Sequence, residues 1–251
     1  MLERQTLPSF FIGPPCTGSS WLHQILSSRA ALPKSTKETR FFDCHFHRGI
    51  EWYRAHYPSG TEEMKAGEVA PTYFASVQAR SRIGVLNPHA KVVCTFRNPV
   101  DRVLSLYRLK RAYGMFSWSL EEAMLRDPEL SESGKDATHL TAWQSALGPD
   151  RVLATFYEDL KHTPQAYLDV LTDFIGVRRF ELTFSDLRFT HTAEQMTLPR
   201  NYHRTRIGTE IAHWLKARHL NMVVAKAKES CMLKLFLGGG ASFSASSSES
   251  D

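Results

Sequence analysis

The chain has 251 residues, of which 42% are hydrophobic and 23% charged, as is typical of a soluble globular protein with a core that needs no disulfide or metal. Its 31 Lys and Arg exceed its 26 Asp and Glu by five, a mild excess that suits anionic small molecules and argues against a nucleic-acid partner. No apolar stretch is long enough to span a membrane, the first ten residues do not resemble a secretory signal, and no CxxC pair occurs, so we expect a cytoplasmic protein with reduced thiols and no membrane partner.

The first predicted element is a buried strand over residues 10–12, because the short apolar run FFI is followed at once by the turn-forming GPP. Apolar residues then recur at helical spacing from Trp21 to Leu26 and predict a helix, with Ser19 or Ser20 as its N-cap. The start of the chain therefore predicts a strand, a tight loop and a helix.

A second buried strand is predicted over residues 91–96, KVVCTF, and it ends at Arg97. Asn98 is expected to cap the next helix and Pro99 to open it, since both residue types favour those positions. Gly114 is expected to close that helix.

Five further elements complete the expected order. Two short helices are predicted over 119–126 and 136–147, and a third strand over 151–156. A helix over 163–175 ended by Gly176 follows, and then a late helix carrying Ile211, Trp214, Leu215 and Met222. Strands separated by helices are typical of a parallel sheet covered on both faces. We therefore expect an α/β protein of the P-loop-like, three-layer α/β/α class, with one domain over residues 1–237 and a flexible Gly- and Ser-rich tail over 238–251.

The loop GPPCTGSS over residues 13–20 fits the phosphate-binding frame G-x-x-x-x-G-[KST]-[ST], with Ser19 in place of the lysine that ATP-binding loops carry. A helix start presents unpaired backbone N–H groups, and the helix dipole favours an anion there. Thr17, Ser19 and Ser20 add hydroxyl donors. A phosphate or a sulfate fits this loop, and a tight turn with a capping serine is the alternative.

Three further stretches follow the loop: KETRFFD at 37–43, EVAPTYF at 68–74 and RNPVDRVLSLY at 97–107. In order and spacing the four resemble the sulfotransferases that depend on 3'-phosphoadenosine 5'-phosphosulfate (PAPS), most closely the heparan sulfate sulfotransferase-like and bacterial branch, over about residues 9–176. The resemblance implies the sulfotransferase fold. It also implies transfer of a sulfuryl group from PAPS to a hydroxyl, less often an amine, of a small molecule or saccharide, with 3'-phosphoadenosine 5'-phosphate (PAP) as product and no metal.

The resemblance also implies roles for individual residues. The first loop of the family holds the 5'-phosphosulfate, which assigns cofactor binding to Cys16, Thr17, Gly18, Ser19, Ser20 and Trp21. Arg97 and Ser105 match the element that holds the 3'-phosphate. Arg200, or Arg204 as the alternative, lies where relatives place a late loop over the cofactor. Glu38 matches the general base that takes the acceptor's proton. An ion pair of Arg97 with Asp101 and a solvent-facing Glu38 remain the alternatives.

Two positions depart from the family pattern. Cys16 stands where the family loop has a lysine that steadies charge on the leaving group, and Val69 where heparan-type relatives often carry another. We hypothesise that Lys37 takes a catalytic role by providing the missing charge, with Lys34 and Arg40 as the other candidates. The alternative functions are a catalytically impaired PAP- or PAPS-binding protein of the same fold and, as a weaker one, a P-loop kinase or NTPase. Residues 43–47, DCHFH, are not expected to bind metal, since no second ligand cluster accompanies them.

Overall fold

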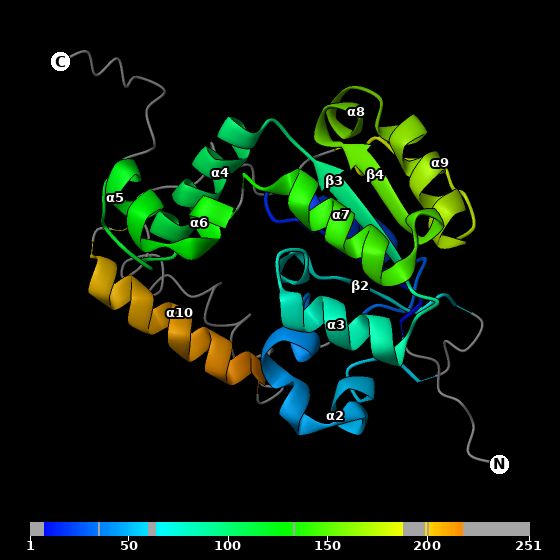
Figure 1. Ribbon diagram of the computed structural model, residues 1–251, viewed down its shortest axis with the longest axis horizontal. Helices are drawn as coiled ribbons and strands as arrows, with labels where there is room; N and C mark the ends of the chain where they lie inside the picture. The colour runs from blue at the N-terminus through cyan, green and yellow to red at the C-terminus, as the bar shows by residue number, and fades with distance from the viewer. Residues whose placement is uncertain are drawn as a thin grey trace. The chain divides into compact units, whose positions relative to one another are not determined.

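The computed structural model describes residues 8–34, 36–59, 64–132, 134–187, 199 and 201–217 (Figure 1). The chain forms two compact units, the first from residues 1–102 with 132–190 and the second from residues 103–131 with 191–251. The predicted domain bounds stay a prediction, and the predicted tail over 238–251 lies outside the described residues.

The first unit contains a parallel sheet of four strands in the order β2-β1-β3-β4. The strands are β1 (Phe10–Gly13), β2 (Gly67–Val69), β3 (Lys91–Phe96) and β4 (Val152–Phe156). The three predicted strands are confirmed. Sequence patterning did not predict β2, because three residues are too few to show a period.

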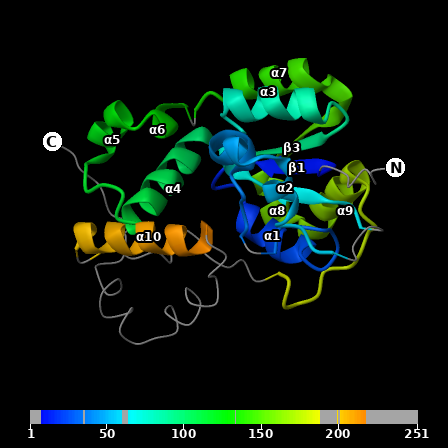
Figure 2. The same cartoon turned by 90° about the horizontal axis from the view of Figure 1, so that it is seen from below.

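Helices cover both faces of this sheet, which confirms the three-layer α/β/α class. Neighbouring strand residues point to opposite faces, so that Phe10 and Val93 join one buried cluster while Phe11 and Val92 join the other. Figure 2 shows helices below the sheet and above it. Those below are α1 (Ser19–Leu26), α8 (Tyr157–His162) and α9 (Pro164–Ile175), and those above are α3 (Val77–Leu86) and α7 (Asp136–Leu147).

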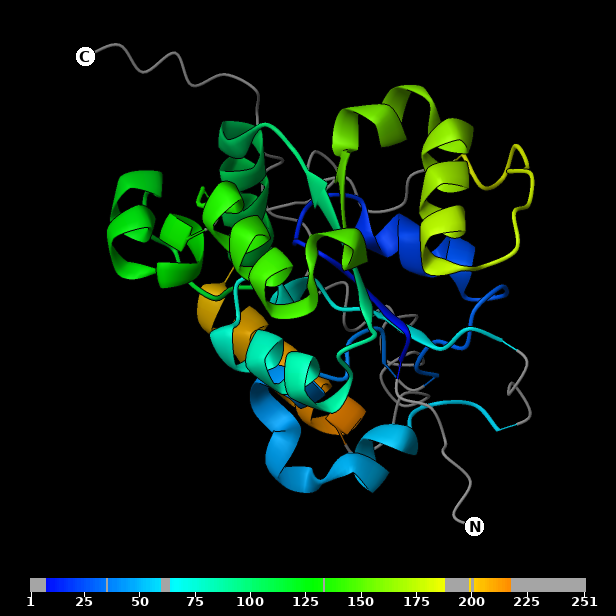
Figure 3. The ribbon, with the colours of Figure 1, turned by 45° about the vertical axis from the view of Figure 1, so that its right-hand side comes forward.

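The strand order decides where a ligand can bind. The chain leaves β1 to form β2 on one side of it and then forms β3 on the other side. In parallel sheets ligands bind beyond the carboxyl ends of the strands, at the point where the order reverses. The loop after β1 and residue Arg97 after β3 both follow strand ends at this edge. Figure 3 shows the same sheet and its helices from another direction.

Local capping explains the helices whose bounds the sequence predicted. Helix α4 (Pro99–Ala112) begins where the Asn98 Oδ1 accepts hydrogen bonds from the backbone N–H of Val100 (3.0 Å) and of Asp101 (3.3 Å). Gly114 and Gly176 take positive φ values of 71° and 75° after α4 and α9, as closing glycines do. The predicted helices over 119–126 and 136–147 are α5 (Leu120–Arg126) and α7.

The second unit is built from the later part of α4 together with α5, α6 (Pro128–Glu132) and α10 (Tyr202–Ala217). Lys110 is buried there between Asp127 (2.6 Å) and Glu129 (2.7 Å). The predicted late helix corresponds to α10, although α10 begins well before Ile211, and Met222 lies outside the described residues.

Short helical elements lie within the longer connections of the first unit. They are η1 (Phe41–His45), η2 (Phe46–Arg48), α2 (Ile50–Arg54), η3 (Pro71–Tyr73) and η4 (Pro149–Arg151). Within the described ranges, every helix is too short or too polar to cross a bilayer.

The predicted serine cap of α1 is wrong. Gly18 is the N-cap, with φ 87° and ψ 9° and no side-chain hydrogen bond, and Ser19 and Ser20 lie inside the first turn. The loop enters the helix through left-handed conformations at Cys16 (φ 63°) and Gly18. Gly18 therefore takes the capping position, and both serines come after it. Their hydroxyls are therefore left to meet another part of the chain.

We predict that Gly18→Ala destabilises the fold more than Gly176→Ala does. Both glycines have left-handed backbone, which costs an alanine about 1 kcal/mol. A Cβ at Gly18 would lie 2.4 Å from the Cδ2 of the buried Leu160, whereas at Gly176 the nearest atom is the Lys65 Cε at 3.5 Å. Overpacking should add about 1–3 kcal/mol at Gly18 alone. Urea unfolding of the two variants measures the difference, and equal losses would contradict the clash.

Candidate active site

The loop after β1 is held from within before it reaches α1. The Thr17 hydroxyl is buried and donates to the Pro14 carbonyl oxygen at 2.8 Å. The start of α1 that follows has no side-chain cap, and the first backbone N–H groups of a helix point away from its own carbonyls. The loop thus presents the positive end of a helix dipole at the carboxyl edge of the sheet.

Lys37 lies at that same helix start. Its Nζ donates to the Ser19 Oγ at 3.0 Å and to the Ser20 Oγ at 3.2 Å. A cation is unfavourable at the positive end of a helix, so the arrangement concentrates positive potential in one place without stabilising the helix. Burial lowers the pKa of Lys37, while the nearby Glu38 and Cys16 oppose that shift. The place is suited to an anion.

Glu38 follows Lys37 directly and has one carboxylate oxygen, Oε1, 3.9 Å from the Lys37 Nζ. The side chain is 24% exposed, so it is neither a free surface carboxylate nor sealed in the core. Burial raises the pKa of Glu38 above its ordinary value, and the charges of Lys37 and then Arg40 oppose the rise. A carboxylate of raised pKa is a stronger base near neutral pH.

Arg97 connects the end of β3 to the same loop. One of its terminal guanidinium nitrogens is 3.5 Å from the Cys16 carbonyl oxygen, a long hydrogen bond, and the guanidinium carbon lies 4.8 Å from the centre of the Tyr157 ring. These contacts keep the guanidinium at the carboxyl edge of the sheet, toward the loop. Asp101, the ion-pair partner considered from the sequence, takes part in neither contact.

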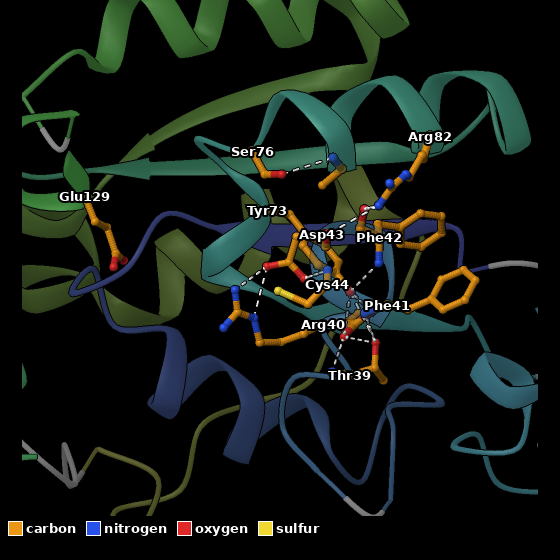
Figure 4. Close-up of polar contacts among 12 residues, drawn as sticks. Thr39, Arg40, Phe41, Phe42, Asp43, Cys44, Tyr73, Ser76, Arg82 and Glu129 are labelled. Atoms are coloured by element: carbon orange, nitrogen blue, oxygen red, sulfur yellow. Dashed lines mark hydrogen bonds and ion pairs between the residues drawn. The ribbon is translucent and has the colours of Figure 1, made fainter. Parts of the chain in front are cut away.

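The three candidates for the missing charge differ in what they contact. Lys34 is exposed, and the guanidinium of Arg40 makes hydrogen bonds to the Asp43 carboxylate at 2.7 and 3.0 Å (Figure 4). Lys37 alone of the three donates to α1. Val69, at the second departure from the family pattern, is completely buried in the core, so that position provides no cation.

The remaining residues predicted to bind the cofactor are Trp21, Ser105 and Arg200. The Trp21 side chain is buried in the core, and its indole N–H donates to the Asp186 carbonyl at 2.5 Å, so a ligand at the helix start would meet its backbone. Ser105 is buried on α4, in the part of that helix that belongs to the second unit. Arg200 lies outside the described residues. Among the described residues, no three His, Cys, Asp or Glu side chains gather as a metal site would require.

Sequence reasoning missed the carboxyl group of Glu68, which is completely buried on β2 beside the Lys37–Glu38 segment. It accepts hydrogen bonds from the backbone N–H and the hydroxyl of Thr39 and from the hydroxyl of Tyr53. Glu68 begins the stretch EVAPTYF at 68–74, but nothing in the sequence distinguishes a buried carboxyl from an exposed one. Only the tertiary structure shows that this carboxyl is buried and bonded to Thr39.

The fold and the site together define a parallel α/β protein with a loop between β1 and a helix start, a cation at that helix start and a carboxylate beside it. Residues 8–220 match the sulfotransferase domain family, and the chain belongs to that family.

Similar proteins agree with this assignment. The chain is 30% identical over 207 residues to the bovine bifunctional heparan sulfate N-deacetylase/N-sulfotransferase 2, covering 73% of this chain and 23% of that protein. It is 30% identical over 189 residues to the human bifunctional heparan sulfate N-deacetylase/N-sulfotransferase 1, covering 66% of this chain and 21% of that protein. The chain therefore spans less than a quarter of the length of these relatives.

Solved structures share the fold. A sulfotransferase from Alicyclobacillus acidocaldarius superposes with a TM-score of 0.61 at 21% identity, over 72% of this chain and 88% of that one. The sulfotransferase domain of the Synechococcus PCC 7002 olefin synthase gives a TM-score of 0.50 at 19% identity, over 80% of this chain and 91% of that one. At these identities the likeness concerns the fold.

We predict that Lys37→Met raises the pKa of His23 toward its ordinary value. Burial lowers the pKa of this α1 histidine, and the positive charge of Lys37 lowers it further, so removal of the charge reverses one of the two causes. NMR titration of the His23 ring measures the shift, and Lys34→Met is the control for loss of a nearby lysine. An unchanged His23 titration would mean that Lys37 does not lie at α1.

Proposed function

We propose that this protein transfers a sulfuryl group from PAPS to a hydroxyl, less often an amine, of a saccharide or small molecule. The proposal rests on the two hydrogen bonds that the Lys37 ammonium donates to the Ser19 and Ser20 hydroxyls, at the positive end of α1. A cation and a helix start that face each other repel, and a bound dianion would relieve that repulsion.

The donors of the site fit the two charged ends of PAPS. Backbone N–H groups at the start of α1, the two serine hydroxyls and Lys37 suit the 5'-phosphosulfate. Arg97, held near the loop by the Cys16 carbonyl and the Tyr157 ring, suits the 3'-phosphate because its planar fork can pair with two phosphate oxygens.

The proposed reaction is an in-line displacement at sulfur. The acceptor oxygen forms a bond to sulfur while Glu38 takes its proton, and the bond from sulfur to the bridging phosphate oxygen breaks. The electron pair of that bond leaves on the phosphate oxygen of PAP, where Lys37 and the α1 N–H groups stabilise the developing charge. The raised pKa of Glu38 makes it a suitable base for this proton.

Lys37 is proposed to do what the family's loop lysine does. Cys16 carries no fixed positive charge, and its backbone occupies a left-handed turn in the loop. The Lys37 ammonium comes from a different segment but lies over the same helix start. The charge is thus supplied from residue 37 rather than from residue 16.

The acceptor class comes from similarity rather than from the site. The relatives are named as bifunctional heparan sulfate N-deacetylase/N-sulfotransferases, which makes a saccharide a candidate acceptor and keeps an amine alongside a hydroxyl. Cys16 and Val69 favour the second candidate function, a protein that binds PAP or PAPS without efficient transfer, since neither provides the cation that relatives have there.

We predict that Lys37→Ala lowers the rate of labelled sulfate transfer from PAPS about 10²–10³-fold, the loss expected for one donor to a charged transition state. Cys16→Lys should keep or raise the rate and, combined with Lys37→Ala, restore it. Lys34→Ala is the control because Lys34 is exposed. Unchanged turnover in Lys37→Ala would remove this lysine from the mechanism, and PAP binding by a protein that transfers to no acceptor would support the second candidate function.

We predict that Arg97→Ala weakens PAP binding about 10–100-fold, the loss expected for a hydrogen-bonded charge contact of about 1.5–3 kcal/mol. Binding of adenosine 5'-phosphate, which lacks the 3'-phosphate, should change less than about twofold. Calorimetric titration of both nucleotides into wild type and variant measures this. Equal weakening of both would show that Arg97 supports the loop rather than the 3'-phosphate.

A further inference from the structure

The Glu68 carboxyl is completely buried, and every hydrogen bond that it accepts from the described residues comes from a neutral donor. The Thr39 N–H lies 2.6 Å and the Thr39 hydroxyl 2.8 Å from Oε1, and the Tyr53 hydroxyl lies 2.8 Å from Oε2. The Tyr73 hydroxyl is 3.3 and 3.4 Å from the two oxygens. No lysine or arginine pairs with this carboxyl in the described part of the chain.

The groups around Glu68 form a connected network. The Tyr57 hydroxyl is 2.9 Å from that of Tyr53 and donates to the Gly67 carbonyl at 3.3 Å. Burial, followed by the negative charge of Glu68, raises the pKa of Tyr53, Tyr57 and Tyr73, so all three remain neutral donors. The negative charge of Glu38 also acts on Glu68 and raises its pKa.

This arrangement does not favour stability. A buried carboxylate without a cation loses its hydration, and burial raises the pKa of Glu68 to about 7 against the opposing hydrogen bonds from Thr39 and Tyr53. A neutral side chain of similar shape would avoid that loss. What the carboxyl provides instead is a fixed position for the groups that donate to it.

What Glu68 holds is the segment that carries the two proposed reactive residues. Thr39 directly follows Lys37 and Glu38, so the bond from its N–H to Glu68 fixes the peptide unit after Glu38. The Thr39 hydroxyl also accepts from the Phe41 N–H at 3.2 Å, and Phe41 is buried (Figure 4). Thr39 thus links the reactive pair to β2 on one side and to the core on the other.

We propose that ionised Glu68 is a positioning residue, which holds Lys37 and Glu38 against the start of α1 through the N–H and hydroxyl of Thr39. The inference rests on the proposed function for the roles of Lys37 and Glu38. A backbone N–H can only donate, so it bonds best to the carboxylate, and protonation of Glu68 weakens that bond.

The proposal implies opposite effects of pH on stability and on positioning. The pKa of Glu68 is about 7 in the folded protein and 4.5 as an ordinary glutamate, so between these values the folded state binds more protons than the unfolded state. Glu68 therefore lowers the stability as pH rises through that window. The same rise in pH ionises the carboxyl and strengthens the bond to Thr39.

The test follows Thr39 and His23 in Glu68→Gln by NMR, with no nucleotide present. In wild type the Thr39 amide should titrate with a midpoint near the Glu68 pKa of about 7, and Glu68→Gln should abolish that transition. Glu68→Gln should also raise the His23 pKa, as loss of Lys37 from the helix start does. Tyr57→Phe is the matched control, since it removes a hydroxyl of the network that does not touch the carboxyl.

Kinetics complete the test. Glu68→Gln should lower kcat about tenfold or more, and its thermal midpoint should vary less between pH 5 and 7 than that of wild type. A Thr39 amide that does not titrate, an unchanged His23, or wild-type kcat in Glu68→Gln overturns the proposal. Should wild type transfer sulfate to no acceptor, the proposed function fails, while the Thr39 and His23 titrations still decide whether Glu68 holds the segment.

Discussion

The contact between the Lys37 ammonium and the start of α1 is the constraint on which the site depends. It places a positive charge at the positive end of a helix, and burial further disfavours the charged form of that lysine. Neither effect stabilises the fold. The contact persists because the surrounding segment is held elsewhere, and it leaves a strong positive potential at the carboxyl edge of the sheet, where parallel α/β proteins bind their ligands.

The support for that contact is itself a compromise. Phe41 and Phe42 are buried directly after the reactive pair and hold the segment in the core by apolar packing. Glu68 holds it by hydrogen bonds, at the expense of a buried carboxyl with no cation beside it. Functional sites commonly keep such unfavourable groups, since the geometry that they impose is needed more than the stability that they remove.

Much of the fold could be predicted because the relevant physics is local. Asn98 caps α4, Gly176 closes α9, and apolar runs form β1, β3 and β4, all from signals within a few residues. The serine cap of α1 failed for a local reason too, since left-handed turns at Cys16 and Gly18 carry both serines into the helix. β2 was missed because its pairing with β1, not its own pattern, makes it a strand.

By itself the sequence determined the α/β class, the loop at the first strand and the segment that carries Lys37, Glu38 and Arg40. Only the tertiary structure decided which of those charges meets the loop, because Arg40 is drawn to Asp43 while Lys37 crosses to Ser19 and Ser20. Likewise, only folding removes Glu68 from water and brings it to Thr39. Such contacts join residues far apart in the chain, and their strength depends on burial, which no local pattern records.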